Sequence, residues 1–142
     1  MLNTYTKGMS AEYSVIVDAL DNGLVPEVPV VPTTVHDMTI AGLRFQVKMG
    51  ESNNKRLTAD IRRPSARCQE YSPKDVDVFA VVDPVSKQIA YIKISEIFNL
   101  KHRLTFFFGR GYTRAGLHSG YSVRYFDDYT NILRVFASAD VA

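Results

Sequence analysis

One segment constrains the fold of this chain most strongly: H-D-M-T-I-A-G-L-R-F-Q-V-K, at residues 36–48. Apolar and polar residues alternate on both sides of Ala41-Gly42, which is the period of a half-buried β-strand. The segment therefore predicts two antiparallel strands joined by a tight turn at Ala41-Gly42. In this register the opposite pairs are Ile40 with Leu43, Met38 with Phe45, and Asp37 with Gln46.

The turn is the weak point of this prediction. A two-residue hairpin turn needs positive φ at both central residues, and alanine adopts such a conformation poorly. A three-residue loop would shift the register by one residue and would move the polar side chains of one strand to the other face. The sequence leaves both registers open.

The alternation also predicts which side chains share a face, because successive residues of a strand point to opposite sides. The apolar set is expected to face the core: Met38, Ile40, Leu43, Phe45 and Val47. The polar set shares the other face: Asp37, Thr39, Arg44, Gln46 and Lys48. The hairpin thus places a carboxylate, a carboxamide and an ammonium group side by side.

These three groups have a chemical use. The side-chain oxygens of Asp37 and Gln46 suit a hard divalent cation, which prefers oxygen ligands. The ammonium group of Lys48 can orient an attacking water or offset the charge that builds on a phosphate. The alternative is a solvated strand face with ordinary polar residues, since short motifs often occur by chance.

The composition indicates one globular domain, because 46% of the 142 residues are hydrophobic and 23% are charged. The net charge is only +2, but the basic residues are unevenly placed. Residues 44–67 carry seven Lys and Arg against two acids, and residues 101–142 carry six against three. Two basic blocks beside a more acidic scaffold favour a surface that meets a polyanion, and scattered solvated charge is the alternative.

A single cysteine, Cys68, excludes an intrachain disulfide and a cysteine-based zinc site. A reducing, cytoplasmic setting fits this cysteine usage. No segment is long and apolar enough for a transmembrane helix, and residues 1–20 lack the apolar region of a signal peptide. We therefore expect no membrane partner.

The remaining periodicity predicts an α/β or α+β layered fold built on one mixed sheet. A helix is expected at residues 10–22, with Ser10 as its N-cap and Gly23 as its stop. Extended segments or strands are expected at residues 25–31, 57–62, 76–83, 88–94, 104–108 and 121–126. A short helix is expected at residues 95–100. A final helix after Asp127 or Asp128 would carry an apolar stripe of Tyr129, Ile132, Leu133 and Phe136.

Further polar residues are candidates for a site. Glu12 lies one position off the apolar stripe of the first helix, although an acid in a first turn also complements the helix dipole. The first basic block, with Tyr71 after it, suits phosphate contact and some base stacking: Lys55, Arg56, Arg62, Arg63 and Arg67. A glycine-rich stretch at residues 109–120 contains Arg110 and Arg114 and could order on nucleic acid. For both basic segments the alternative is a solvated surface loop.

The order of these residues resembles a known family. Glu12 in an early helix, Asp37 on a strand and Gln46-Val47-Lys48 on the next strand are similar to the motif of the PD-(D/E)XK nuclease superfamily. Most members have Asp or Glu where this chain has Gln46. The Q-x-K form resembles the branch that contains homing endonucleases of bacterial and phage group I introns. His36 stands where that branch tends to have Tyr, and the proline that usually precedes the Asp is absent.

The resemblance covers roughly residues 6–98 and implies a restriction-endonuclease-like mixed β-sheet flanked by helices. Residues 101–142 lie outside the resemblance, and from their composition we expect a C-terminal extension packed on the core that contacts DNA, mediates oligomerisation or does both. The resemblance itself implies a nuclease core at residues 1–100. It assigns Mg²⁺ to Asp37 and Gln46, with Glu12 holding a second metal or a metal-bound water. Lys48 would align or activate the attacking water.

The function implied is a magnesium-dependent, site-specific DNA endonuclease that hydrolyses phosphodiester bonds, of the homing endonuclease type. The partners implied are double-stranded DNA and further copies of the chain, in a dimer or a dimer of dimers, because two strands need two active sites. One alternative is a structure-selective nuclease similar to Holliday-junction resolvases. The other is a non-catalytic DNA-binding protein on a nuclease scaffold, since Gln46 removes one negative charge from the metal site.

Overall fold

The computed structural model describes residues 4–29, 36–61, 73–97, 103–109 and 123–137. Within these ranges, one α-helix, α1 (Thr4–Asp21), precedes eight strands. The strands are β1 (Pro26–Glu27), β2 (Met38–Ile40), β3 (Leu43–Met49), β4 (Glu51–Ser52), β5 (Arg56–Asp60), β6 (Val78–Val82), β7 (Ile89–Lys93) and β8 (Arg103–Phe107). Three 3₁₀-helical turns complete the described part: η1 (Ile94–Glu96), η2 (Phe126–Asp128) and η3 (Ile132–Phe136).

The predicted hairpin is formed by β2 and β3, and its register is confirmed. Met38 pairs with Phe45 and Ile40 pairs with Leu43. The turn has two central residues with positive φ, 47° at Ala41 and 86° at Gly42, so the alanine adopts the left-handed conformation that the two-residue turn requires. The alternative three-residue loop is therefore excluded.

The hairpin belongs to a five-stranded mixed sheet with the order β1-β2-β3-β6-β7. The central pair, β3 and β6, is parallel, and the other neighbours are antiparallel. The segment at residues 25–31 was expected to be an extended segment or a strand, and its described part contains β1, which lies at the edge of this sheet. The mixed sheet with a flanking helix confirms the predicted fold class.

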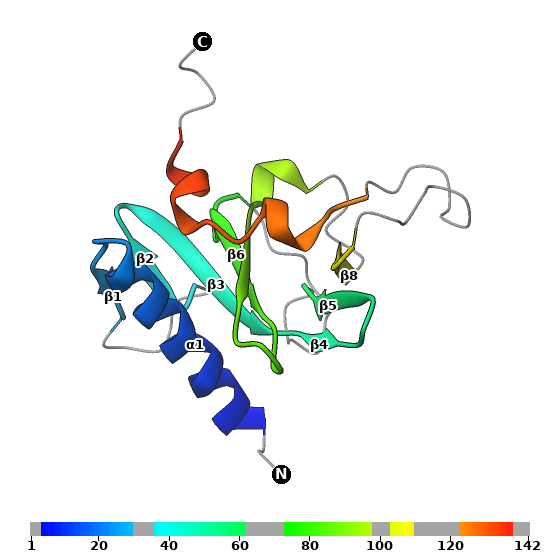
Figure 1. The fold of residues 1–142 in the computed structure, drawn as a ribbon. Helices are drawn as coiled ribbons and strands as arrows, with labels where there is room; N and C mark the ends of the chain where they lie inside the picture. The colour runs from blue at the N-terminus through cyan, green and yellow to red at the C-terminus, as the bar shows by residue number, and fades with distance from the viewer. Residues whose placement is uncertain (1–3, 30–35, 62–72, 98–102, 110–122, 138–142) are drawn as a thin grey trace.

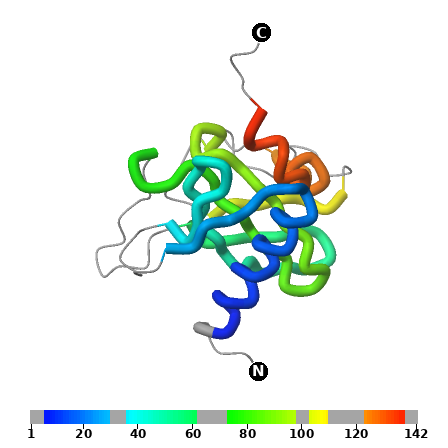
Figure 2. Tube along the Cα trace, turned by 90° about the vertical axis from the view of Figure 1, so that its left-hand side faces the viewer, coloured from blue at the N-terminus to red at the C-terminus, as the bar shows by residue number. Residues whose placement is uncertain are grey.

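Each face of this sheet packs against a different element (Figure 1). On one face, Phe45 and Val47 of β3 lie in a core cluster with Ala11, Val15 and Ala19 of α1. Figure 2 views the molecule from the helix side and shows α1, in blue, lying across the strands. On the opposite face, Phe79 and Val81 of β6 lie in a second core cluster with residues of β5 and β8.

A second sheet corrects the prediction of a single one. β4, β5 and β8 form a separate three-stranded antiparallel sheet, in which β5 is central. The segments at residues 57–62 and 104–108 were correctly expected to be extended. Their pairing joins distant parts of the chain, and local periodicity carries no information on such partners.

The first helix begins six residues earlier than its predicted N-cap, Ser10. The Ser10 carbonyl accepts a hydrogen bond from the Ser14 hydroxyl at 3.0 Å, so Ser10 lies inside the helix. Gly23 ends the helix as expected, with φ of 77°. The amides of Leu24 and Gly23 donate to the carbonyls of Ala19 and Leu20, which is the Schellman arrangement of a helix C-terminus.

The predicted final helix is wrong. Residues 126–128 and 132–136 form 3₁₀-helical turns, whose side chains repeat every three residues, so Ile132 and Val135 are buried while Leu133 is 45% exposed. The segment at 121–126 is not a strand in its described part, where Tyr125 makes one isolated bridge to Phe107. Of the short helix expected at 95–100, residues 98–100 lie outside the described ranges, and the described part includes the end of a 3₁₀-helical turn, η1, at Ile94–Glu96.

Arg134 fastens this C-terminal segment to the main sheet. Its guanidinium donates to both carboxylate oxygens of Glu96, at 2.7 and 3.1 Å, and to the Tyr91 carbonyl at 2.7 Å. It also lies 4.5 Å from the centre of the Tyr129 ring. The division of the chain at residue 100 stays a prediction. In the part of the chain that the structure describes, no helix is long and apolar enough to cross a membrane.

Candidate active site

Two carboxyl groups from distant elements meet at one end of the hairpin. Glu12 projects from α1 and Asp37 immediately precedes β2. Burial raises the pKa of Glu12 from 4.5 to about 7, and the charge of Asp37 and a hydrogen bond to its side chain act in the same direction. At neutral pH the pair therefore holds a proton about half of the time. A cation bound there would replace that proton.

Asp37 is held against the backbone of β3. Its own amide donates to the Phe45 carbonyl at 2.8 Å, and its carboxylate Oδ2 accepts from the Val47 amide at 2.7 Å. Val47 stands between the two predicted site residues Gln46 and Lys48. The hairpin thus fixes the carboxylate at the centre of the Q-x-K segment.

Gln46 is buried, and its amide oxygen is an unsatisfied acceptor. The residue is 9% exposed, and among the described residues Oε1 has no hydrogen-bond partner. A buried polar atom without a partner usually costs about 1–3 kcal/mol, so its presence calls for an explanation. A metal ion or a bound donor at Oε1 would remove that cost.

Lys48 is half-buried and lies on the same face of β3 as Gln46. In the parallel ladder Gln46 pairs with Phe79 and Lys48 pairs with Val81, both of which face the second sheet. Glu12 approaches from the helix side instead. The structure therefore brings Glu12 into contact with Asp37, and it attaches Asp37 to the strand that carries Gln46 and Lys48.

This donor set fits a hard divalent cation. Carboxylate and amide oxygens are the ligands that Mg²⁺ and Ca²⁺ prefer. Within the described ranges no three His, Cys, Asp or Glu side chains gather as a metal site. The candidate set has only two carboxylates, so its third oxygen has to come from the Gln46 amide.

Arg44 was expected to share the polar face of the hairpin, but the structure gives it a different role. Its guanidinium forms an ion pair with Asp77 at 3.0 Å and donates to the carbonyls of Pro73 and Lys74. The hydrogen bond from Arg44 holds the pKa of Asp77 below its ordinary value. Through these contacts Arg44 connects β3 to residues 73–77, which lead into β6.

Two of the predicted DNA-binding residues can be placed. Lys55 precedes β5 and Arg56 is its first residue; both are exposed, and their amides donate to the Asn53 side chain at 2.8 and 3.0 Å. The other predicted residues lie outside the described ranges: Arg62, Arg63, Arg67, Arg110 and Arg114. Arg103 is a further exposed cation that the sequence analysis did not single out. In the sequence, Arg103 and Thr105 alternate with apolar residues, and this alternation indicates an exposed strand face once the pairing with β5 is known.

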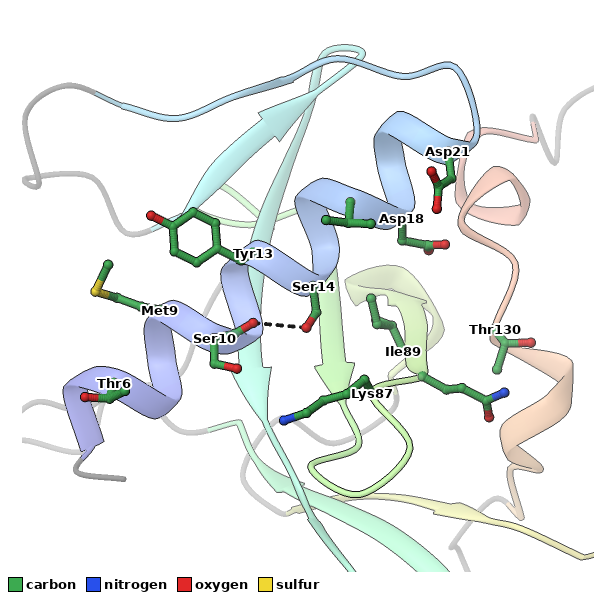
Figure 3. Close-up of a pocket in the computed structure, with 12 residues that line it drawn as sticks. Thr6, Met9, Ser10, Tyr13, Ser14, Asp18, Asp21, Lys87, Ile89 and Thr130 are labelled. Atoms are coloured by element: carbon green, nitrogen blue, oxygen red, sulfur yellow. Dashed lines mark hydrogen bonds between the residues drawn. The ribbon is translucent and has the colours of Figure 1, made fainter. Parts of the chain in front are cut away.

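A groove of about 900 Å³ runs beside α1 (Figure 3). Its lining includes Tyr13, Val17 and Asp18 of the helix and Lys87 and Ile89 near the start of β7. None of the four candidate catalytic residues is among the residues that line it. The Tyr91 hydroxyl of β7 donates to the Asp18 carboxylate of α1 at 2.6 Å, and this bond connects the helix to the sheet.

No family model matches the sequence, and no curated protein does. Among solved structures, the chain is similar to a bacterial homing endonuclease, I-Ssp6803I, with a TM-score of 0.67 and 17% sequence identity. The match covers 96% of this chain and 92% of the other. At this identity the similarity shows a shared fold, which agrees with the fold class expected from the sequence.

Proposed function

We propose that this protein is a magnesium-dependent DNA endonuclease that hydrolyses phosphodiester bonds at a specific site, of the homing endonuclease type. The observation that carries the proposal is the half-buried Glu12–Asp37 pair, attached through the Val47 amide to the strand of Gln46 and Lys48. The fold shared with a bacterial homing endonuclease supports it. So does the order of these four residues along the chain.

The residues have distinct roles in this proposal. Asp37 and Gln46 hold the magnesium ion through their side-chain oxygens, and Glu12 holds a second ion or a metal-bound water. Bound magnesium offsets negative charge on the scissile phosphate. Lys48 positions the attacking water and stabilises the charge that develops on the phosphate oxygens. The Asp37 amide donates to the Phe45 carbonyl, and the Val47 amide donates to the Asp37 carboxylate; these two bonds keep the carboxylate in place before DNA binds.

Cleavage of long duplex DNA tests the proposal. The substrate includes the sequence that flanks the gene, and the reaction is run with magnesium and with EDTA. We expect discrete fragments from the wild type with magnesium only, and a loss of at least about 100-fold in rate for Asp37→Asn and Lys48→Ala. Asp21→Asn and Lys7→Ala are matched controls, because both residues are exposed on α1.

Each alternative function gives a different result. A structure-selective nuclease would cut four-way junctions in preference to any linear sequence. A DNA-binding protein without catalytic activity would bind duplex DNA tightly and cut nothing in any divalent metal. Cleavage that survives both Asp37→Asn and Lys48→Ala would place the active site elsewhere.

A further inference from the structure

In the second sheet, the central strand β5 and the edge strand β8 form an antiparallel ribbon with two different faces. Its inner face is buried in the core: Leu57, Ala59, Leu104 and Phe106. Its outer face carries one buried side chain, Phe107, opposite Arg56, and otherwise side chains that are exposed or half-buried: Arg56, Thr58, Asp60, Arg103 and Thr105. On this face the Thr58 hydroxyl donates to the Glu51 carbonyl of β4 at 3.3 Å, and Phe107 makes a backbone bridge to Tyr125.

The ribbon lies close to the candidate active site. Its inner residues pack on Phe79 and Val81 in one core cluster. These two residues are the direct ladder partners of Gln46 and Lys48. The chain also passes from β3 to β4 through the single residue Gly50. The ribbon is therefore attached rigidly to the strand that carries the proposed catalytic side chains.

The order of side chains on the outer face suits a groove of duplex DNA. Thr58 lies directly opposite Thr105 at the middle of the ribbon. Arg56 lies at one end of the ribbon, beside the exposed Lys55, and Arg103 lies at the other end, opposite Asp60. Positions 56 and 60 of an extended strand are about 13 Å apart, at roughly 3.3 Å per residue. The major groove is about 12 Å wide and admits a two-stranded ribbon.

We propose that the outer face of the β5–β8 ribbon enters the major groove of the DNA substrate. Thr58 and Thr105 contact base edges there and contribute to site recognition, because a hydroxyl can both donate and accept hydrogen bonds. Arg56 and Arg103 contact phosphates on the two sides of the groove. This inference rests on the proposed function for the nature of the ligand and adds the residues that select its sequence.

The first experiment measures binding without cleavage, so that it does not depend on nuclease activity. Affinity for a random-sequence duplex of about 30 base pairs is measured in EDTA between about 50 and 200 mM NaCl. Each phosphate contact contributes about 0.9 to the slope of log affinity against log salt. We expect Arg56→Gln and Arg103→Gln each to reduce that slope by about one contact. Lys7→Gln, on the opposite side of the sheet, is expected to leave it unchanged.

The second experiment measures sequence preference. The ends of fragments cut from genomic DNA are sequenced for the wild type, for the double variant Thr58→Val with Thr105→Val, and for Thr6→Val on α1 as the control. Valine keeps the β-branched shape and removes only the hydroxyl. We expect preference at one or a few adjacent base pairs to relax by roughly tenfold in the double variant, since a base contact discriminates by about that factor. The control is expected to keep the wild-type preference.

The outcomes separate this inference from the proposed function. If the wild type cuts DNA, and all ribbon variants keep its salt slope and its cut sites, the ribbon inference alone is overturned. If the wild type does not cut, but Arg56→Gln and Arg103→Gln reduce the salt dependence of DNA affinity, the nuclease proposal is overturned and the ribbon inference is retained. If the wild type does not cut and the two arginine variants keep its salt slope, both proposals are overturned.

Discussion

The Glu12 carboxyl is half-buried and lies against the carboxylate of Asp37, so its ionisation is coupled to the stability of the fold. Its pKa is about 7 in the folded protein and near its ordinary value of 4.5 in the unfolded chain. Because the folded pKa is the higher one, the folded state binds more protons between these values. The stability contributed by protonated Glu12 is complete below pH 4.5 and is lost as the pH rises through 7.

We therefore expect Glu12→Gln to stabilise the metal-free protein at pH 8 and to leave its stability unchanged at pH 4. The gain at pH 8 should be about 1–2 kcal/mol, because solvent screens part of the effect at a half-buried site. Urea unfolding in EDTA at both pH values measures it. Asp21→Asn, on the exposed side of the same helix, should show no such pH dependence. An equal effect at both pH values would contradict the coupling.

The alanine of the hairpin turn is held in a strained conformation. Ala41 has φ of 47°, a left-handed conformation that costs an L-residue about 1–2 kcal/mol and costs glycine little. The side chain is exposed, so its removal forfeits no packing. We expect Ala41→Gly to stabilise the protein by about 0.5–1 kcal/mol after the entropy that glycine loses on folding. Thermal unfolding measures this gain.

Val85→Gly is the control for Ala41→Gly, because Val85 is also in an exposed turn but has no positive φ. It should destabilise the protein by about 0.5–1 kcal/mol, because glycine raises the conformational entropy of the unfolded chain without relieving any backbone strain in the folded state. A loss of stability in both variants would mean that the Ala41 conformation is not strained.

At the scale of the elements, Gly50 is the single residue that connects β3 of the main sheet to β4 of the second sheet. A Cβ on this residue would lie 2.5 Å from Leu57 Cδ1 and 2.9 Å from the Thr58 carbonyl oxygen. Leu57 is fully buried and cannot move aside cheaply. We expect Gly50→Ala to destabilise the protein by about 1–3 kcal/mol, which is typical of an overpacked core.

Gly8→Ala makes the same chemical change in open space and should act in the opposite direction. Apart from its chain neighbours and the backbone of α1 itself, no described atom lies within 4 Å of a Cβ placed on Gly8, which is inside the helix. Alanine should therefore stabilise the helix by about 0.5–1 kcal/mol. Denaturant unfolding of the two variants side by side measures both effects. A neutral Gly50→Ala would show that β3 and β5 approach each other less closely than the structure has them.

At the scale of the whole molecule, the proposed function requires more than one chain. Cutting both strands of a duplex takes two active sites, and in the proposed function the four candidate residues of one chain supply one of them. We expect a symmetric homo-oligomer, a dimer or a dimer of dimers. Light scattering of the Asp37→Asn variant, with and without duplex DNA, measures the mass while the DNA stays intact. A monomer under both conditions would count against double-strand cleavage by this assembly.

The sequence by itself determined the hairpin and the candidate residues on it. The register of β2 and β3, and the burial of Met38, Phe45 and Val47, follow from alternation within one short segment. The positions of Asp37, Gln46 and Lys48 follow from the same alternation. Local periodicity suffices here because both strands of a hairpin are adjacent in the chain and a tight turn fixes their pairing.

Only the tertiary structure decided how distant segments combine. The contact of Glu12 with Asp37 depends on how α1 packs across the sheet, and the pairing of Thr58 with Thr105 depends on a strand that comes much later in the chain. The final apolar stripe predicted an α-helix, yet the contacts of Arg134 with Glu96 and Tyr91 accompany 3₁₀-helical turns. Side-chain patterns specify which residues are buried, whereas partners far apart in the chain are selected by the shape and chemistry of the assembled core.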